Sequence, residues 1–186
     1  MFDILNKKKS TMIEKAVSTS CGMWGLWDYE EYRTVVTYED WDALFCENDA
    51  MKQQIAKAKF VPINIHSDGC FQFRVKINKT LSDREKQYVF MQSQEYLFES
   101  SGQVVLSGIE AINRAVNASD GIMFDLYRGK YAVSICMIDW TKEPNMKLPD
   151  GTPSPNALPD FIVLIHSIME EQTDYRKGLE TFSNDK

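Results

Sequence analysis

Acidic side chains are concentrated in one short segment of the chain, residues 28–49. The segment holds eight carboxylates and a single basic residue, Arg33, which gives it a formal charge of −7. The whole chain has a formal charge of −6, so the rest of the sequence is close to neutral. A local excess of this size projects a negative field that attracts basic partners. The eight acidic residues are Asp28, Glu30, Glu31, Glu39, Asp40, Asp42, Glu47 and Asp49.

The acidic segment has two interpretations. In the first, it is a solvated helix whose carboxylates complement the positive end of the helix dipole. In the second, it is a docking surface for a basic protein such as a nuclease or a toxin, because complementary charge directs association. Trp41 lies among the carboxylates and would be a binding hot spot if exposed, although a large aromatic side chain is more often in the core. The candidate partner-binding residues are Glu39, Asp40, Trp41, Asp42, Glu47 and Asp49.

A second candidate site surrounds a long loop at residues 141–160. The loop contains five prolines and few core residues, and loops of this length are either functional or mobile. Asp139 and Trp140 precede the loop, and His166 follows it in an apolar strand. An indole beside Asp139 is expected to raise the pKa of that carboxyl. These three residues define an alternative pocket, which would make the chain a ligand-binding or enzymatic protein.

Sequence motifs for catalysis and metal binding are absent. The sequence has no glycine-rich phosphate loop, no G-x-S-x-G elbow and no H-E-x-x-H pair. His66 and His166 lie far apart, and neither has a second metal ligand at helical or turn spacing. We predict no catalytic residue, no cofactor and no metal site, so that the protein is not an enzyme. The four cysteines are scattered and are predicted to be buried small residues of a reducing compartment: Cys21, Cys46, Cys70 and Cys136.

Composition also limits the other partners. The acidic balance disfavours nucleic-acid binding, because Arg74 and Lys76 alone neutralise too little of a phosphate backbone. No segment approaches the ~18 apolar residues that are needed to cross a membrane. The lysines at 7–9 follow a short apolar patch, which is not the order of a signal peptide. We expect a soluble cytoplasmic protein with a solvated N-terminus; export without a classical signal and the oligomeric state remain open.

Helical patterns are confined to the N-terminal third. The spacing of apolar residues predicts a helix over 38–58, in two parts, with acidic residues in its first turn. A short helix is predicted at 10–17, capped by Ser10 or Thr11, and a short strand at 34–37. After residue 60 the apolar pattern changes to alternation, as in residues 71–77, which predicts a half-buried antiparallel strand.

The segment MFDLYRGKYAVSICMIDW (123–140) is predicted to form a strand, a tight turn at Arg128 and Gly129, and a second strand. The second strand is apolar on both faces. Such a strand lies in the centre of a sheet and is covered on both sides. We therefore interpret it as a wall of the fold and not as the floor of a catalytic site.

The predicted fold class is mainly β. Seven or eight strands, separated by turns every 8–12 residues, indicate an antiparallel β-sandwich. The chain is expected to form a single domain, 1–186, with a partly helical part (1–59) packed on one edge of a sandwich core (60–170). A long strand is expected at 87–100 and a polar, frayed tail at 171–186. A structural module that associates through a self-complementary apolar patch is a further interpretation.

Residues from about 60 to 168 resemble the nuclease-inhibitor family of bacterial competence systems, the ComJ or Nin type. The similar phrases are DGCFQFRVKIN (68–78), YLFESSGQVVLSG (96–108), FDLYRGKYAVSICMIDW (124–140) and DFIVLIH (160–166). The resemblance implies a β-sandwich inhibitor that masks a nuclease, and it transfers no functional residue. The leading hypothesis is therefore an immunity or inhibitor protein that occludes a basic nuclease or toxin with its acidic face.

Overall fold

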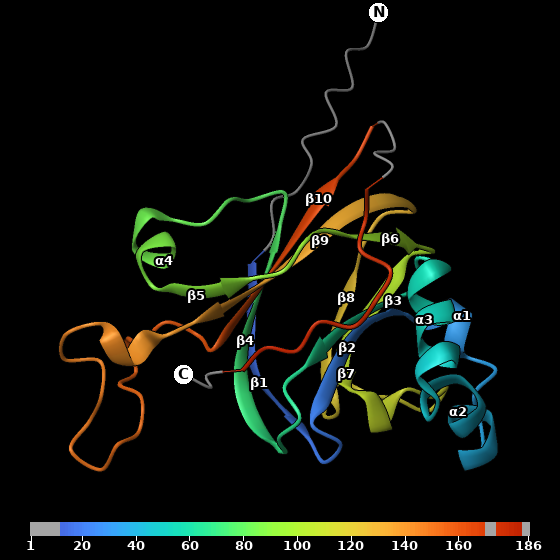
Figure 1. Cartoon of the computed structure of the whole chain (residues 1–186), viewed down its shortest axis with the longest axis horizontal. Coiled ribbons are helices and arrows are strands. Elements are labelled where there is room, and N and C mark those ends of the chain that lie inside the picture. The colour runs from blue at the N-terminus through green and yellow to red at the C-terminus, as the bar shows by residue number, and fades with distance from the viewer. Residues whose placement is uncertain (1–11, 170–173, 184–186) are drawn as a thin grey trace, which may run out of the picture.

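Two β-sheets pack against each other around one hydrophobic core in the computed structural model, which describes residues 12–169 and 174–183 (Figure 1). Over these residues the chain forms ten strands and four short α-helices, so the mainly-β prediction is confirmed, with more strands than the seven or eight expected. The strands are β1 (Met12–Thr19), β2 (Met23–Asp28), β3 (Phe60–Asn64), β4 (Gly69–Ile77), β5 (Val89–Gln92), β6 (Tyr96–Ser100), β7 (Gln103–Gly108), β8 (Gly121–Asp125), β9 (Gly129–Ile138) and β10 (Phe161–Ser167). The helices are α1 (Tyr29–Tyr32), α2 (Tyr38–Phe45), α3 (Asn48–Ala56) and α4 (Asp83–Gln87).

The larger sheet has the strand order β1-β4-β10-β9-β5. β6 also pairs with β9, along residues Gly129 to Val133, whereas β5 pairs with the other end of the same strand. β10 and β4 run parallel, and the remaining pairs are antiparallel. The expected antiparallel pairing therefore holds for this sheet except between β4 and β10, and the sheet is mixed.

The smaller sheet has the order β3-β2-β7-β8 and is antiparallel throughout. β3 contains Pro62 and forms one edge, as a strand with proline should. Helix α3 packs against β3, which confirms a helical segment on one edge of the sandwich. β1 and β2 belong to the two sheets, so the part of the chain before residue 60 contributes to the sandwich itself as well as to its helices.

The strands β8 and β9 follow each other in sequence but belong to different sheets. The predicted strand-turn-strand at 123–140 is thus a connection that crosses from one sheet to the other. A hydrogen bond of 2.9 Å from the Leu126 N–H to Gly102 O fixes the start of this connection. β9 pairs with β10 on one side and with β5 and β6 on the other. Its side chains are buried for most of its length, which confirms that this strand is a central wall.

Aromatic side chains join the two sheets in the core. The Trp24 ring of β2 lies 5.5 Å from the ring of Phe73 on β4 and 6.5 Å from that of Phe161 on β10. Gly25 faces the ring of Phe60, and a Cβ at this position would overlap it. The sandwich therefore owes its cohesion to large buried rings from both layers.

Several local predictions are corrected by the structure. The helix predicted at 10–17 is strand β1 from Met12 onward; its proposed caps and the lysines at 7–9 lie outside the described residues. The strand predicted at 34–37 is the turn that leads into α2. The long strand predicted at 87–100 begins after α4 and is divided into β5 and β6, because one extra residue enters the pairing with β9 between Gln92 and Tyr96. Ser93, at this irregularity, donates its N–H to Ile135 O and accepts the Ile135 N–H with its hydroxyl oxygen.

The C-terminal segment 174–183 packs on the sandwich and does not fray. The Phe182 side chain is buried, and its ring meets that of Phe161 edge-on at 5.8 Å. The Phe182 N–H donates to Asn64 O at 2.8 Å, beside a bridge between Asn64 and Thr181. This segment therefore covers part of the β3 edge. None of the helices in the described residues is long and apolar enough to span a bilayer.

Candidate protein-binding site

The carboxylates of the acidic segment fall into a structural group and an exposed group. Asp28 is buried and caps α1, accepting the Glu31 N–H at 3.2 Å. Glu30 pairs with Arg33 at 2.8 Å and Glu31 with Lys57 at 3.7 Å. These three residues therefore stabilise the local fold, and the remaining carboxylates on α2 and α3 are the candidates for binding.

Helix α2 is fixed at its start by a capping box. The Asp40 N–H donates to the Thr37 hydroxyl at 3.2 Å, and the Asp40 carboxylate accepts the N–H groups of Thr37 and Val36 at 2.9 and 3.0 Å. These backbone hydrogen bonds lower the pKa of Asp40. Asp40, predicted as a contact residue, is thus already engaged in positioning the helix.

The other four predicted carboxylates form what we call the acidic surface. Glu39, Glu47 and Asp49 are exposed, and Asp42 is half-buried. Asp49 pairs with the exposed Lys52 at 3.1 Å, whereas the other three form no ion pair within 12–169 and 174–183. The sequence has no basic residue between Arg33 and Lys52. The acidic surface therefore retains most of its negative charge. Its members are Glu39, Asp42, Glu47 and Asp49.

A hollow of about 350 Å³ opens beside α2. Val35 and Ile112 are buried at this place, and the half-buried Trp41 is held by a hydrogen bond of 2.7 Å from its indole N–H to Ile109 O. The Tyr38 ring is 68% exposed and lies 5.9 Å from that of Trp41. We call this site the α2 hollow. It is lined by Cys21, Val35, Val36, Thr37, Tyr38, Trp41, Glu110, Ile112 and Asn113.

Trp41 was predicted from the sequence as a binding residue, but its apolar partners in the hollow were not. Val36 and Trp41 occupy the N′ and N4 positions around the Thr37 cap, which are the positions of a hydrophobic staple. That pattern was available in the sequence, but the β-branched residues at 34–37 suggested a strand instead. Ile112 comes from a distant segment and had no local signal.

Two residues of the alternative pocket, Asp139 and Trp140, form local contacts at the ends of the 141–160 loop. The Asp139 carboxylate accepts the Thr141 hydroxyl at 2.5 Å and pairs with Lys142 at 2.9 Å. These contacts lower the pKa of Asp139, which corrects the expected increase. The Trp140 indole N–H donates to Asp160 at 2.8 Å. Both side chains therefore hold the ends of the 141–160 loop.

His166 lies away from these two residues. It stands opposite Ala132 in the β9–β10 register, seven positions along β9 from Asp139. At a rise of about 3.3 Å per residue, this separation is roughly 23 Å. The structure therefore does not bring the three predicted residues together, and none of them lines the α2 hollow.

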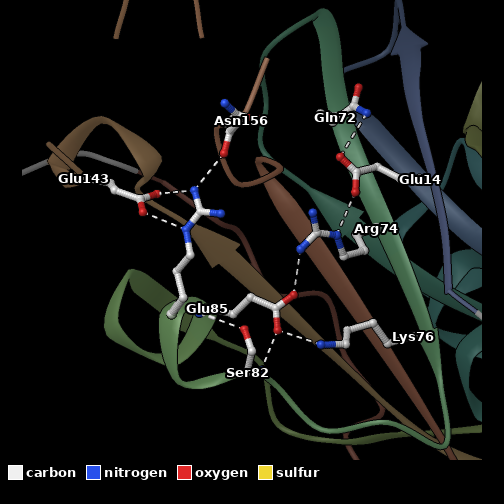
Figure 2. A network of polar contacts seen from close by, with 9 residues as sticks. Glu14, Gln72, Arg74, Lys76, Ser82, Glu85, Glu143 and Asn156 are labelled. Atoms are coloured by element: carbon white, nitrogen blue, oxygen red, sulfur yellow. Dashed lines mark hydrogen bonds and ion pairs between the residues drawn. The ribbon is translucent and has the colours of Figure 1, made fainter. Parts of the chain in front are cut away.

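A buried polar network ties α4 to the larger sheet (Figure 2). Glu85 accepts Lys76 Nζ at 2.6 Å and Arg74 Nη1 at 2.7 Å, and Arg74 also pairs with Glu14 of β1 at 2.7 Å. Burial alone would raise the pKa of Glu85, but the hydrogen bonds from Lys76, the Ser82 backbone and Arg74 lower it to about 2. The two basic residues of β4 are therefore used internally and do not form a free basic patch.

The same helix anchors the 141–160 loop. The Arg84 guanidinium pairs with both Glu143 oxygens at 2.6 and 2.8 Å and donates to Asn156 O at 2.7 Å. Leu158 is buried in a small cluster with Cys136 and Ile162 on this side of the sheet. The loop thus packs over the outer face of the larger sheet, on the opposite side of the sandwich from α2 and α3 in Figure 1.

The capping box provides a modest test of how the acidic surface is positioned. Thr37→Ala removes the hydroxyl acceptor for Asp40 N–H and should lower the free energy of unfolding by about 1 kcal/mol. Urea denaturation monitored by circular dichroism measures this change. Thr34→Ala, at an exposed residue three positions earlier, is the matched control and should change stability by less than about 0.5 kcal/mol. Equal effects of the two substitutions would contradict the capping role.

Comparison with known proteins gives a likeness in fold only. No family model matches the sequence, and no curated protein matches it. One solved structure of similar fold is described as "Crocagin biosynthetic gene J"; it is 14% identical, with a TM-score of 0.54 over 85% of this chain and 97% of that one. A second is ComJ of Bacillus subtilis, described as an inhibitor of the DNA degrading activity of NucA. It is 11% identical, with a TM-score of 0.51 over 86% of this chain and 98% of ComJ.

The chain resembles ComJ in fold. This confirms the resemblance that the strand phrases after residue 60 suggested. At 14% and 11% identity, the two likenesses concern the fold and carry no residue role to this chain. What the site does is therefore argued from its own geometry.

Proposed function

We propose that this protein is a non-enzymatic binding module that inhibits a basic nuclease or toxin by covering its substrate cleft. The observation that carries the proposal is the acidic surface of α2 and α3, whose four carboxylates form one ion pair, Asp49–Lys52, and no other among the described residues. The ComJ-like fold supports the proposal, since ComJ is described as a nuclease inhibitor.

The mechanism follows from charge complementarity. A nuclease cleft carries basic side chains that bind phosphates, and carboxylates on a rigid surface compete for the same side chains. Long-range attraction between opposite charges speeds association, and salt screens it within about 10 Å at moderate ionic strength. Inhibition should therefore be competitive with DNA or RNA and should weaken steeply as salt increases.

Affinity capture tests the proposal. The tagged full chain, incubated with lysate of the source organism, should retain a basic protein at low salt and release it at high salt. The captured protein is then purified and its cleavage of DNA or RNA measured with increasing amounts of the chain. We expect activity to fall until the two proteins are equimolar. A captured partner that is acidic, or that stays bound at high salt with no loss of its activity, would contradict the proposal.

A further inference from the structure

The α2 hollow lies next to the acidic surface and has an apolar character of its own. Tyr38 and Val36 are among the most exposed large hydrophobic residues of the described chain, and both line this hollow. Because both line one hollow, they are not isolated exposed residues, and apolar patches rimmed by polar residues mark interaction sites. We propose that the α2 hollow receives one apolar side chain of the partner, flanked in the partner's sequence by lysine or arginine. This inference rests on the proposed function and specifies how the same surface selects its partner.

The polar groups of the hollow are already occupied by the protein. The Glu110 carboxylate accepts the Thr19 hydroxyl at 2.9 Å and the Ser20 N–H at 2.7 Å. The Asn113 side-chain oxygen Oδ1 accepts the Ala115 N–H at 2.7 Å, and Thr37 belongs to the capping box. A side chain that enters the hollow therefore meets few free hydrogen-bonding groups. Its contacts are mainly with apolar side chains of the hollow. An apolar guest gains from such a site, whereas a polar one loses its hydration without replacement.

The size of the hollow fits one large side chain. Its volume of about 350 Å³ is at the lower end of the range for small-molecule pockets, roughly 300–1,000 Å³. The side of the hollow formed by Tyr38 and Trp41 offers aromatic surface, which is the usual surface of an interface hot spot. A phenylalanine- or leucine-sized side chain fits within this space, with room left for part of the backbone that carries it.

The charges around the hollow select the residues that flank this group. Glu39 follows Tyr38 directly, and Asp42 is close enough to Tyr38 to raise the pKa of its hydroxyl by a hydrogen bond. The exposed Arg114 lies on the other side, where its backbone N–H donates to Val35 O at 3.0 Å. The negative field is therefore strongest along α2. Basic residues on both sides of the apolar group can reach this helix.

The hollow is preformed. Trp41 is held by its hydrogen bond to Ile109, the Tyr38 ring lies beside it at an angle of 30°, and α2 begins at a complete capping box. Binding therefore requires little ordering of the protein, which lowers the entropic cost of association. A rigid site of this kind supports measurable binding even of a short peptide.

Three capped pentapeptides test the inference by NMR titration of the ¹⁵N-labelled full chain at low salt. The first has phenylalanine between two pairs of lysines, the second has serine in place of phenylalanine, and the third has glutamates in place of the lysines. We expect the first to bind about 10-fold more tightly than either of the others. Its shifts should centre on Val35, Tyr38, Ile112 and the indole N–H of Trp41.

A pair of tyrosine substitutions provides the matched control. Tyr38→Ala removes one side of the hollow and should weaken binding of the phenylalanine peptide about 10-fold, to the level of the serine peptide. Tyr127→Ala removes a side chain that is 83% exposed and does not line the hollow, and should leave binding unchanged. Because both tyrosines are exposed, neither substitution should unfold the protein.

The outcomes separate this inference from the proposed function. Equal binding of the phenylalanine and serine peptides, with shifts on α3 only, would overturn the hollow as an anchor site and leave the acidic surface intact. Equal binding of the glutamate peptide would overturn the requirement for basic flanks. No shift at the hollow with any peptide would also overturn the inference. The proposed function itself is tested separately, by the capture experiment, where the partner is a whole protein.

Discussion

Replacing Glu85 by glutamine should lower the free energy of unfolding by about 3 to 5 kcal/mol. The Glu85 side chain is only 3% exposed and neutralises Lys76, whose side chain is 7% exposed. Glutamine keeps the shape but removes the charge, so the Lys76 ammonium is left buried without a counterion. An uncompensated buried charge is far more costly than a lost surface ion pair. Denaturation in urea, monitored by tryptophan fluorescence, measures the change.

Two further variants test the cause of this loss. Asp83→Asn lies two residues away on α4, where the carboxylate is fully exposed and pairs with Lys86; its effect should stay within about 0.5 kcal/mol. The double variant Glu85→Leu with Lys76→Met replaces the buried charges by apolar groups and should be more stable than Glu85→Gln. A loss of less than 1 kcal/mol in Glu85→Gln would show that the network contributes little.

The Glu85 carboxylate should also make the free energy of unfolding depend on pH in the acidic range. The pKa of Glu85 is about 2 in the folded chain, against a usual value of 4.5. Because the folded pKa is the lower one, its stabilisation is fully present above pH 4.5 and is lost as the pH falls toward 2. The difference corresponds to about 3 kcal/mol. In Glu85→Gln this component is absent, so the stabilities of the two proteins should converge between pH 4.5 and 2.

Neutralising the acidic surface should weaken partner binding by about 100-fold or more. The variant combines Glu39→Gln, Asp42→Asn, Glu47→Gln and Asp49→Asn and leaves the capping residue Asp40 unchanged. Most of the loss should appear as slower association, because these charges act at long range. The salt dependence of the affinity should decrease in the same variant. Surface plasmon resonance with the captured partner, at two salt concentrations, measures both quantities.

A matched control separates the acidic surface from net charge. Asp68→Asn, Asp83→Asn, Glu95→Gln and Asp125→Asn change the formal charge by the same amount at exposed residues outside α2 and α3. This control should retain the affinity of the natural chain within a few-fold. If it loses as much affinity as the acidic-surface variant, total charge and not the α2–α3 surface determines binding.

The sequence predicted the elements whose signal is local. The alternation along residues 71–77 and the two apolar faces of β9 identified strands, and the acidic turns after Thr37 identified α2. β1 was predicted as a helix because Thr11 and Glu14 match a capping box, while its pairing with β4 joins positions 50 or more residues apart. The crossover between β8 and β9 was equally hidden, since local pattern cannot show that consecutive strands enter different layers.

In the candidate site, too, features with a local sequence signal could be predicted and features set by long-range contacts could not. The acidic residues could be selected from the sequence because charge density is visible along the chain. The hollow could not, because Ile112 and Glu110 reach it from a segment about 70 residues away from Trp41. Arg74 and Lys76 were placed on a solvent-facing side of β4; Glu85 of α4 covers them, and only the folded chain shows this. Long-range packing therefore determined what sequence patterns could not predict.

Hydrogen exchange of the complex tests the central claim most directly. The chain is measured alone and with the partner captured at low salt, and amide protection is compared along the sequence. We predict new protection in 35–56, which includes α2 and α3, and no change in 141–160. Protection confined to the 141–160 loop or to β5, with 35–56 unchanged, would show that the partner binds elsewhere and would contradict the account.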